Sequence, residues 1–374
     1  MNEFEIPPIS TLAGSTLLNY LKILRKGKIS VRFYWKLFLT TLIILISTPF
    51  QAWEHLYFQK RMNGLKFKKA PLFILGHWRS GTTLIHNLMA QDPSAGFIST
   101  YQSLFPNNLA SKWIFKTFMR INMPKKRPTD NVKLNVNFPQ EDEFAFSNCQ
   151  PNAYYNFFYF PENYRTFFEK SILHKNLTQK EVKTWYKEYD RLIKKALINT
   201  GGERVIIKNP VNTGRIDKIV KLYPDAKFLY IYRNPYTVFF STQKFFYQLF
   251  PTLWLHKTTN EFIDKMIFEV YVDLMELYEK QKSLIPPENI MEIRFEDLEM
   301  NPLRMTEKIY NQLLKEDFRQ IESCFSNYIQ TQKSYRKNRY TVTAGMVETI
   351  EQNWGKYIAK YGYQLPDEIN IETV

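Results

Sequence analysis

Three short apolar runs, each ending in a polar turn, are the clearest pattern along the chain. They are Pro71–Leu75, Arg204–Lys208 and Lys227–Tyr232, and each predicts a strand. The first run is followed by Gly76–Thr83, which is rich in Gly, Ser and Thr, and then by Leu84–Ala90, which predicts the first turns of a helix. A strand, a Gly-rich turn and a helix in this order direct backbone N–H groups and a helix N-terminus toward an anion. The pattern therefore predicts a phosphate-binding loop.

The cation of this loop differs from that of ATP-binding loops. The pattern G-x-x-x-x-G-K-[ST] places a Lys directly after the second Gly, where it reaches the phosphates of ATP. Here Thr82 holds that position, and Arg79 supplies a cation from inside the loop. We therefore expect the loop to bind an anion other than a nucleoside triphosphate, with an ATP-dependent phosphotransferase as an alternative.

The segment Gly76–Thr83 resembles the 5′-phosphosulfate loop of sulfotransferases that use PAPS (3′-phosphoadenosine 5′-phosphosulfate). A second block extends the resemblance, because Arg233 at a strand end and Ser241 eight residues later match the family's positions for the 3′-phosphate. Arg offers a planar fork of donors to phosphate oxygens, and Ser adds a short hydroxyl donor. Lys208 resembles the family's Lys beside the bridging oxygen of the sulfuryl group. These motifs lie within a resemblance that covers roughly residues 70–360.

The resemblance implies a PAPS site and assigns a role to each matching residue. Arg79 and the loop backbone would cradle the phosphosulfate, and Lys208 would neutralise the leaving group. The residues implied for binding PAPS are Arg79, Ser80, Gly81, Thr82, Thr83, Arg233, Ser241, Arg336 and Lys337. The last two belong to a loose match to the family's Arg-Lys-Gly loop, in which Asn338 replaces the Gly.

The usual catalytic base of the family is missing. Cytosolic members follow the strand-end Lys with Thr-His, whereas Asn209-Pro210 follows Lys208 here. A Pro-x-Glu-Asp-Glu-x-Ala block recurs in the resembling branch, and some sulfotransferases use Glu as the base. This chain carries that block at residues 139–145. The base is therefore sought among its carboxylates.

We predict that Glu141 is the base, with Glu143 as the second candidate and His77 as the third. Residues 141 and 143 lie about 200° apart on a helix, so both cannot face the donor. Asp142 is interpreted as a structural cap or ion-pair partner. The structural alternative is that Pro139 begins a helix whose dipole favours acidic residues in its first turn.

Residues 1–65 differ from the rest of the chain. A basic lead precedes Leu37–Trp53, which are 17 residues without a charge. This run begins too deep for a signal peptide and is short for a spanning helix, and Pro49 is expected to kink or end it. An interfacial helix, a helix buried against the domain and a membrane span remain as interpretations. Since bacteria make PAPS in the cytosol, we expect a cytoplasmic protein, peripheral at the inner face of the membrane.

Residues of about 93–200 form the longest insertion between binding strands, and we expect them to recognise the acceptor. Residues 144–168 hold eleven aromatics, and a second aromatic set follows Ser241. These rings predict either a core or an apolar pocket for a sterol or lipid alcohol. A carbohydrate site would need more charged and amide groups among them. From about 173 to 196 the pattern turns Lys/Glu-rich and amphipathic, which predicts a solvated helix.

Composition limits the function classes. The 374 residues carry a net charge of +15, which favours an anionic partner. No RNP, zinc-finger or helix–turn–helix pattern is present, so we expect no nucleic-acid partner. The two Cys lie far apart and the five His are dispersed, so we expect no metal.

We therefore expect a three-layer α/β/α fold with a central parallel sheet, like that of P-loop nucleotide kinases. It would occupy residues 66–374, preceded by an apolar helical segment at 1–65. The expected function is transfer of a sulfuryl group from PAPS to a hydroxyl on a hydrophobic small molecule or lipid. A glycan sulfotransferase, an ATP phosphotransferase and a membrane-surface binding module remain as alternatives.

Overall fold

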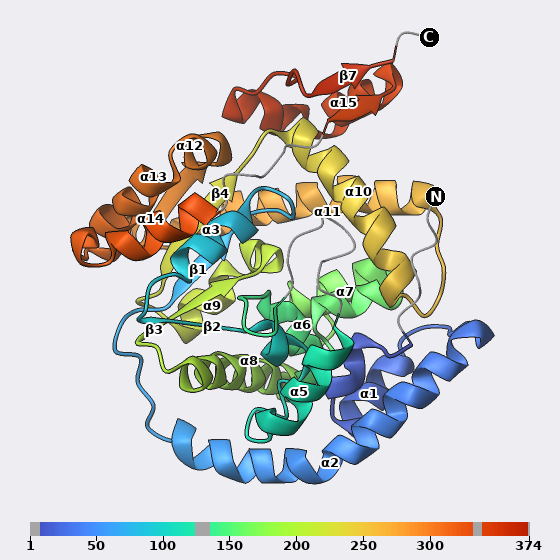
Figure 1. Cartoon of the computed structure of the whole chain (residues 1–374). Coiled ribbons are helices and arrows are strands. Elements are labelled where there is room, and N and C mark those ends of the chain that lie inside the picture. The colour runs from blue at the N-terminus through green and yellow to red at the C-terminus, as the bar shows by residue number, and fades with distance from the viewer. Residues whose placement is uncertain (1–7, 124–134, 332–338, 373–374) are drawn as a thin grey trace. The chain divides into compact units, whose positions relative to one another are not determined.

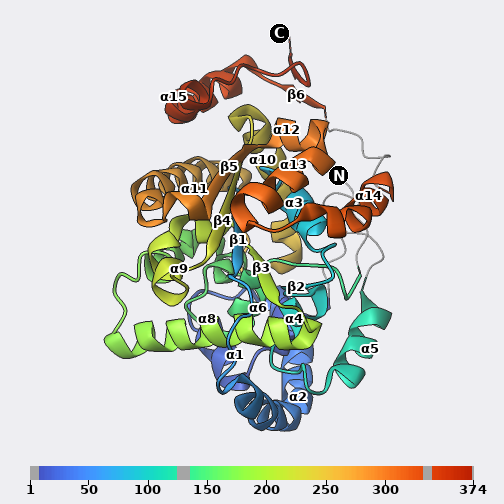
Figure 2. The same ribbon diagram turned by 90° about the vertical axis from the view of Figure 1, so that its left-hand side faces the viewer.

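The computed structural model describes residues 8–123, 135–331 and 339–372 (Figures 1 and 2). The chain divides into two compact units. Unit 1 comprises residues 1–70, 94–207 and 245–262, and unit 2 comprises residues 71–93, 208–244 and 263–374. The N-terminal segment and nearly all of the expected acceptor insertion thus belong to the same unit.

Unit 2 contains the parallel strands that carry the predicted loop. They are β1 (Leu72–Leu75), β4 (Lys227–Tyr232) and β5 (Ile290–Arg294), with β4 pairing to both of the others. All four residues of β1 are buried, as a continuous apolar run predicts for a strand covered on both faces. Figure 2 shows α9 and α11 on one side of these strands and α3, α13 and α14 on the other. This is the predicted α/β/α layering around a parallel sheet.

Among the described residues, six α-helices lie wholly within unit 2. They are α3 (Thr82–Met89), α9 (Ile216–Leu222), α12 (Phe295–Met300), α13 (Pro302–Lys308), α14 (Glu322–Thr331) and α15 (Ala344–Tyr361). A single turn of π-helix, Ile309–Leu314, extends α13. Strands β6 (Tyr340–Val342) and β7 (Ile369–Ile371) form a separate parallel pair. Two helices belong to both units: α10 (Pro235–Leu253) and α11 (Asn260–Gln281).

Unit 1 is mostly helical. Its helices are α1 (Leu17–Leu24), α2 (Tyr34–Met62), α4 (Thr100–Leu104), α5 (Lys112–Asn122), α6 (Asp142–Cys149), α7 (Tyr164–Ser171) and α8 (Gln179–Thr200). Strand β2 (Ala95–Phe97) pairs in parallel with β3 (Arg204–Lys208). Lys208, the last residue of β3, is the first residue of the second segment of unit 2. A capping box between Thr178 and Glu181 starts α8, and Gly201 in the left-handed region ends it.

The aromatic residues predicted to form either a core or a pocket pack against one another in unit 1. Phe157 and Phe158 meet Phe250 at ring-centroid distances of 5.8 and 5.6 Å. Tyr154, Tyr155 and their neighbours through Phe160 are all buried. Their role in unit 1 is therefore that of a hydrophobic core.

One predicted helix boundary is wrong, and one of the two effects expected of Pro49 is not observed. The helix expected to start at Pro139 begins at Asp142, because the preceding backbone pairs instead with the segment before α4: Gln140 N–H donates to Ile98 O at 2.8 Å. Helix α2 also runs through Pro49 rather than ending there. Near Pro49, the side chain of Gln51 donates to Ser15 O at 3.0 Å, which ties this part of α2 to the segment before α1.

Candidate active site

The predicted phosphate loop connects β1 to α3, and its two glycines are required by geometry. Gly76 has φ +142°, and a Cβ there would lie 2.5 Å from the carbonyl oxygen of Ile231. Gly81 has φ +99°, and its Cβ would lie 2.1 Å from the ring of Phe295. Only glycine combines a positive φ with such close approach. The loop is therefore held tightly against the ends of β4 and β5.

Arg79 occupies the left-handed region at φ +66°, which costs a residue with a side chain about 1 kcal/mol or more. Its Nε donates to Ser241 Oγ at 2.9 Å, and its carbonyl oxygen accepts from Arg233 Nη1 at 3.2 Å. The loop cation and both residues predicted at the 3′-phosphate are therefore brought together within unit 2. Strained backbone of this kind is typical of functional sites.

The first turn of α3 presents its N-terminus at the same loop. Gly81 is the N-cap, and the first N–H groups bonded inside the helix are those of Leu84 and Ile85, which donate to Gly81 O. The N–H groups of Thr82 and Thr83 precede them, where a helix terminus attracts anions. Ser80 Oγ donates to His77 O at 2.8 Å, so this hydroxyl also stabilises the turn.

Lys208 lies at the end of β3 and is buried. Its Nζ donates to Thr83 Oγ1 at 3.4 Å. The predicted cation for the leaving group and a predicted loop residue are thus neighbours in unit 2. A buried ammonium beside a helix N-terminus makes this part of the loop strongly electropositive.

Two contributors to the site were missed by the sequence analysis. Thr213 Oγ1 accepts from Gly76 N–H at 2.9 Å and donates to Gly76 O at 3.2 Å, which clamps the start of the loop. Phe295 lies under the guanidinium of Arg233, 4.1 Å from its carbon to the ring centroid, a cation–π contact. Phe295 begins α12 directly after β5, and its position as an aromatic residue at a strand end was the only feature of the sequence that could have indicated it. The sequence carried no comparable signal for Thr213.

His77 is the third candidate base, and its surroundings favour a structural role. Its ring is buried edge-on against Trp78 and Tyr271, and its Nδ1 lies 3.0 Å from Trp78 O. Burial lowers the pKa of His77 from 6.5 to about 3. A neutral imidazole with so low a pKa is a weak proton acceptor.

The carboxylates predicted as bases lie around the start of α6 in unit 1. Glu141 is the N-cap residue, half-buried, and its Oε2 accepts from the hydroxyl of Tyr155 at 2.5 Å. Glu143 is fully buried and accepts from Tyr154 N–H at 2.5 Å. Asp142 accepts from the hydroxyl of Tyr189 at 2.7 Å, a structural contact. Glu141 is therefore the most accessible of the three.

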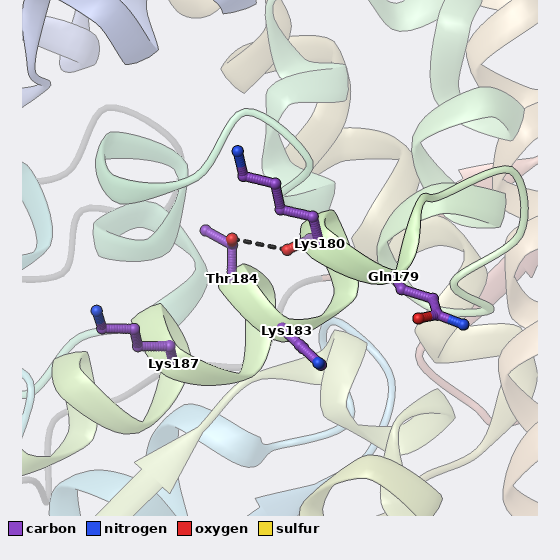
Figure 3. A pocket seen from close by; sticks show the side chains of 5 residues that line it. All are labelled: Gln179, Lys180, Lys183, Thr184 and Lys187. Atoms are coloured by element: carbon purple, nitrogen blue, oxygen red, sulfur yellow. Dashed lines mark hydrogen bonds between the residues drawn. The ribbon is translucent and has the colours of Figure 1, made fainter.

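Arg336 and Lys337 lie outside the described residues. Within the described ranges, no group of three or more His, Cys, Asp or Glu residues could hold a metal ion. A surface hollow of about 480 Å³ is lined by the first turns of α8, including Lys180, Lys183 and Lys187. Figure 3 shows their amines pointing in different directions, so we assign no ligand to it.

Comparison with known proteins decides the family. Residues 71–318 match the sulfotransferase family, and this range includes the loop, Lys208, Arg233 and Ser241. The chain belongs to the sulfotransferase family. It is therefore a sulfotransferase by family, and sulfotransferases in general use PAPS.

Curated relatives and solved structures agree with this membership. The chain is 28% identical over 326 residues to the omega-hydroxy-beta-dihydromenaquinone-9 sulfotransferase Stf3 of Mycobacterium bovis, covering 87% of this chain and 83% of that protein. The same values hold for Stf3 of Mycobacterium tuberculosis. The crystal structure of sulfotransferase STF9 from Mycobacterium avium matches with a TM-score of 0.70 at 15% identity, covering 93% and 90% of the two chains. STF1 from Mycobacterium tuberculosis gives 0.66 at 14% identity, covering 90% of each chain. The fold is thus that of known sulfotransferases.

Proposed function

We propose that this sulfotransferase transfers the sulfuryl group of PAPS to a hydroxyl on a hydrophobic acceptor. The observation that carries the proposal is the hydrogen-bonded group of Arg79, Ser241 and Arg233. It joins the cation of an anion-binding loop to residues that match the family's 3′-phosphate positions. A donor with phosphates at both ends, such as PAPS, would use both sets of contacts.

The proposed reaction is an in-line displacement at sulfur. The acceptor oxygen forms a bond to sulfur while the bond from sulfur to the bridging oxygen breaks, which yields a sulfate ester and adenosine 3′,5′-bisphosphate. Lys208 and the N–H groups at the start of α3 stabilise the charge that develops on the leaving phosphate. Arg79 orients the sulfuryl group. Glu141 takes the proton of the acceptor hydroxyl.

The acceptor class is inferred from the curated relative. The name of Stf3 gives a hydroxylated dihydromenaquinone as its acceptor, which is a lipid-like alcohol. We infer a lipid or similar hydrophobic alcohol for this chain as well. An enzyme with such an acceptor works at or near a membrane surface, which agrees with the apolar N-terminal segment.

The test is a transfer assay with radiolabelled PAPS and matched sets of lipid alcohols, sterols and glycans. We expect labelled sulfate esters of lipid alcohols, no labelled glycan, and no phosphate transfer from ATP and Mg²⁺. Lys208→Ala should remove the product while Lys315→Ala, at an exposed residue directly after the π-helical turn of unit 2, should not. Transfer to glycans alone would overturn the acceptor class, and the absence of any transfer from PAPS would overturn the donor.

A further inference from the structure

Helix α2 turns its polar side inward and its apolar side outward. Its buried residues are Lys36, Thr40, Ile44, Ser47, Glu54 and Phe58. Its exposed large hydrophobic residues, which we call the α2 face, are Tyr34, Trp35, Phe38, Leu42, Leu45, Ile46, Trp53 and Leu56. With about 100° per residue, the two sets fall on opposite sides of the helix. A surface helix of a soluble protein shows the reverse arrangement.

The inward polar side is bound to the rest of unit 1 in both halves of the helix. Lys36 Nζ donates to Thr252 O at 2.7 Å. Glu54 forms a buried ion pair with Lys195 of α8 and accepts from Ala110 N–H at 2.5 Å. Breaking such a pair leaves an unpaired buried charge, which is strongly destabilising. The contacts therefore oppose any arrangement in which α2 leaves unit 1 to cross a membrane alone.

By length and composition, the helical stretch Val31–Met62 could still cross a membrane, and 28% of its most apolar window is buried. The uncharged part, Leu37–Trp53, would be about 25 Å long as a helix, against about 30 Å for the hydrocarbon core of a bilayer. The short uncharged part of the helix and the contacts of its inward side together favour a helix that lies in the plane of the membrane surface.

Helix α5 adds to the apolar surface of unit 1. Its inner side packs on α2 through Phe115 and Phe50, whose ring centroids are 5.5 Å apart. Its outer side exposes Trp113, Phe118 and Ile121. Figure 1 shows both helices in unit 1, α2 in blue and α5 in teal. Two neighbouring helices thus expose large apolar side chains, including Trp residues, which prefer membrane interfaces.

The charge around the α2 face identifies the kind of partner. Exposed cations lie before the helix and at its end: Lys22, Arg25, Lys28, Arg32, Lys60, Arg61, Lys66 and Lys68. The only carboxylate among residues 8–70 is Glu54, which is buried. A second copy of the chain docked on this face would place its own cations against these cations, and the two sets would repel each other. An apolar face bordered by cations instead suits a bilayer with anionic headgroups.

We propose that the α2 face, together with the exposed side of α5, docks in one leaflet of an anionic lipid bilayer with α2 parallel to the surface. This surface is separate from the donor site, and the inference holds whatever the donor and acceptor are. Its consequence is that unit 1 is held at the surface from which a lipid substrate can be taken.

The first test is flotation of the full chain with vesicles of phosphatidylcholine, with or without phosphatidylglycerol. We expect binding to the anionic vesicles that weakens with salt. Leu45→Glu with Ile46→Glu should lower the partition coefficient at least tenfold, because it places charge in the apolar contact. Met300→Glu, at an 84% exposed apolar residue of unit 2, is the matched control and should bind like the wild type. Replacing Arg25 or Lys28 by an uncharged residue should lower the partition coefficient about fivefold each on anionic vesicles and leave it unchanged on neutral ones.

The second test separates docking from spanning. In a Cys149→Ser, Cys324→Ser background, Arg32→Cys and Gln59→Cys report the two ends of the helix. In-plane docking predicts that a membrane-impermeant maleimide labels both ends on protein added outside preformed vesicles. Protection of one end would show a span. Unchanged flotation of the Leu45→Glu, Ile46→Glu variant, or dimerisation through this face without vesicle binding, would also overturn the proposal. Thermal unfolding of each variant reports folding without reference to donor binding.

Discussion

Arg79 Nε donates a hydrogen bond of 2.9 Å to the hydroxyl of Ser241, which stands 162 positions later in the chain. The carbonyl oxygen of the same arginine accepts from Arg233. The proposed contacts for the two ends of the donor are thus parts of one hydrogen-bonded group. Residues linked in this way couple energetically, so a change at one should alter binding by the others.

Replacing Arg79 by Ala should lower kcat on the order of 100-fold or more, by analogy with the loss of a donor to developing negative charge. The measurement is steady-state sulfate transfer from PAPS. Arg319→Ala is the matched control, because Arg319 is 85% exposed at its side chain and pairs locally with Asp317. Near-normal turnover of Arg79→Ala would refute the assigned role.

The two glutamates should respond differently to removal of their charge. Glu141→Gln should lower kcat by about 10²- to 10⁴-fold without changing the affinity for adenosine 3′,5′-bisphosphate, because only proton transfer is lost. Glu143→Gln should instead lower the unfolding midpoint, since the buried carboxylate accepts Tyr154 N–H. Exposed Glu162 provides the control, Glu162→Gln. If Glu141→Gln turned over like this control, the base would have to be sought elsewhere.

The loop glycine Gly76 is expected to matter for stability as well as function. Gly76→Ala combines a positive φ with a Cβ placed 2.5 Å from Ile231 O, so we expect a loss of about 2 to 4 kcal/mol in the free energy of unfolding. Gly362→Ala has a positive φ but open space around the Cβ and should cost only about 1 kcal/mol. Denaturant unfolding of both variants compares them directly. Equal losses would mean that the close approach at Gly76 carries no cost.

How much of this site the sequence predicts depends on whether the signal is local. The strands were predictable because a buried parallel strand is a continuous apolar run, and the loop was predictable because its glycines have fixed spacing. Thr213 was not predictable, since its contact with Gly76 depends on a turn that carries no pattern. The start of α6 was misplaced for a similar reason: local preference favoured Pro139, but pairing with the distant Ile98 backbone prevailed.

The interpretation of His77 shows the same limit. Residue type and loop position made it a candidate base, and rings contributed by distant helices bury it. Its pKa, about 3 in the folded protein, lies below the ordinary 6.5. The stabilising effect of the neutral ring is therefore complete above pH 6.5 and is lost as the pH falls toward 3.

When the pH falls from 7 to 5, protonation of His77 in the unfolded chain should lower the free energy of unfolding of the wild type by about 2 kcal/mol. His77→Phe should not show this loss. Denaturant unfolding of both proteins at the two pH values measures the difference. Equal losses of unfolding free energy in the wild type and in His77→Phe would contradict the burial of His77. A rate profile whose inflection near neutral pH disappears in His77→Phe would restore it as a candidate base.

The central claim is that one site in unit 2 recognises both phosphates of the donor. Calorimetric titration with adenosine 3′,5′-bisphosphate and with adenosine 5′-monophosphate tests it most directly. We predict that the bisphosphate binds at least tenfold more tightly, and that Arg233→Ala with Ser241→Ala removes most of this preference while Arg319→Ala leaves it intact. Equal affinities for the two nucleotides in the wild-type protein, or no binding of either, would contradict the account.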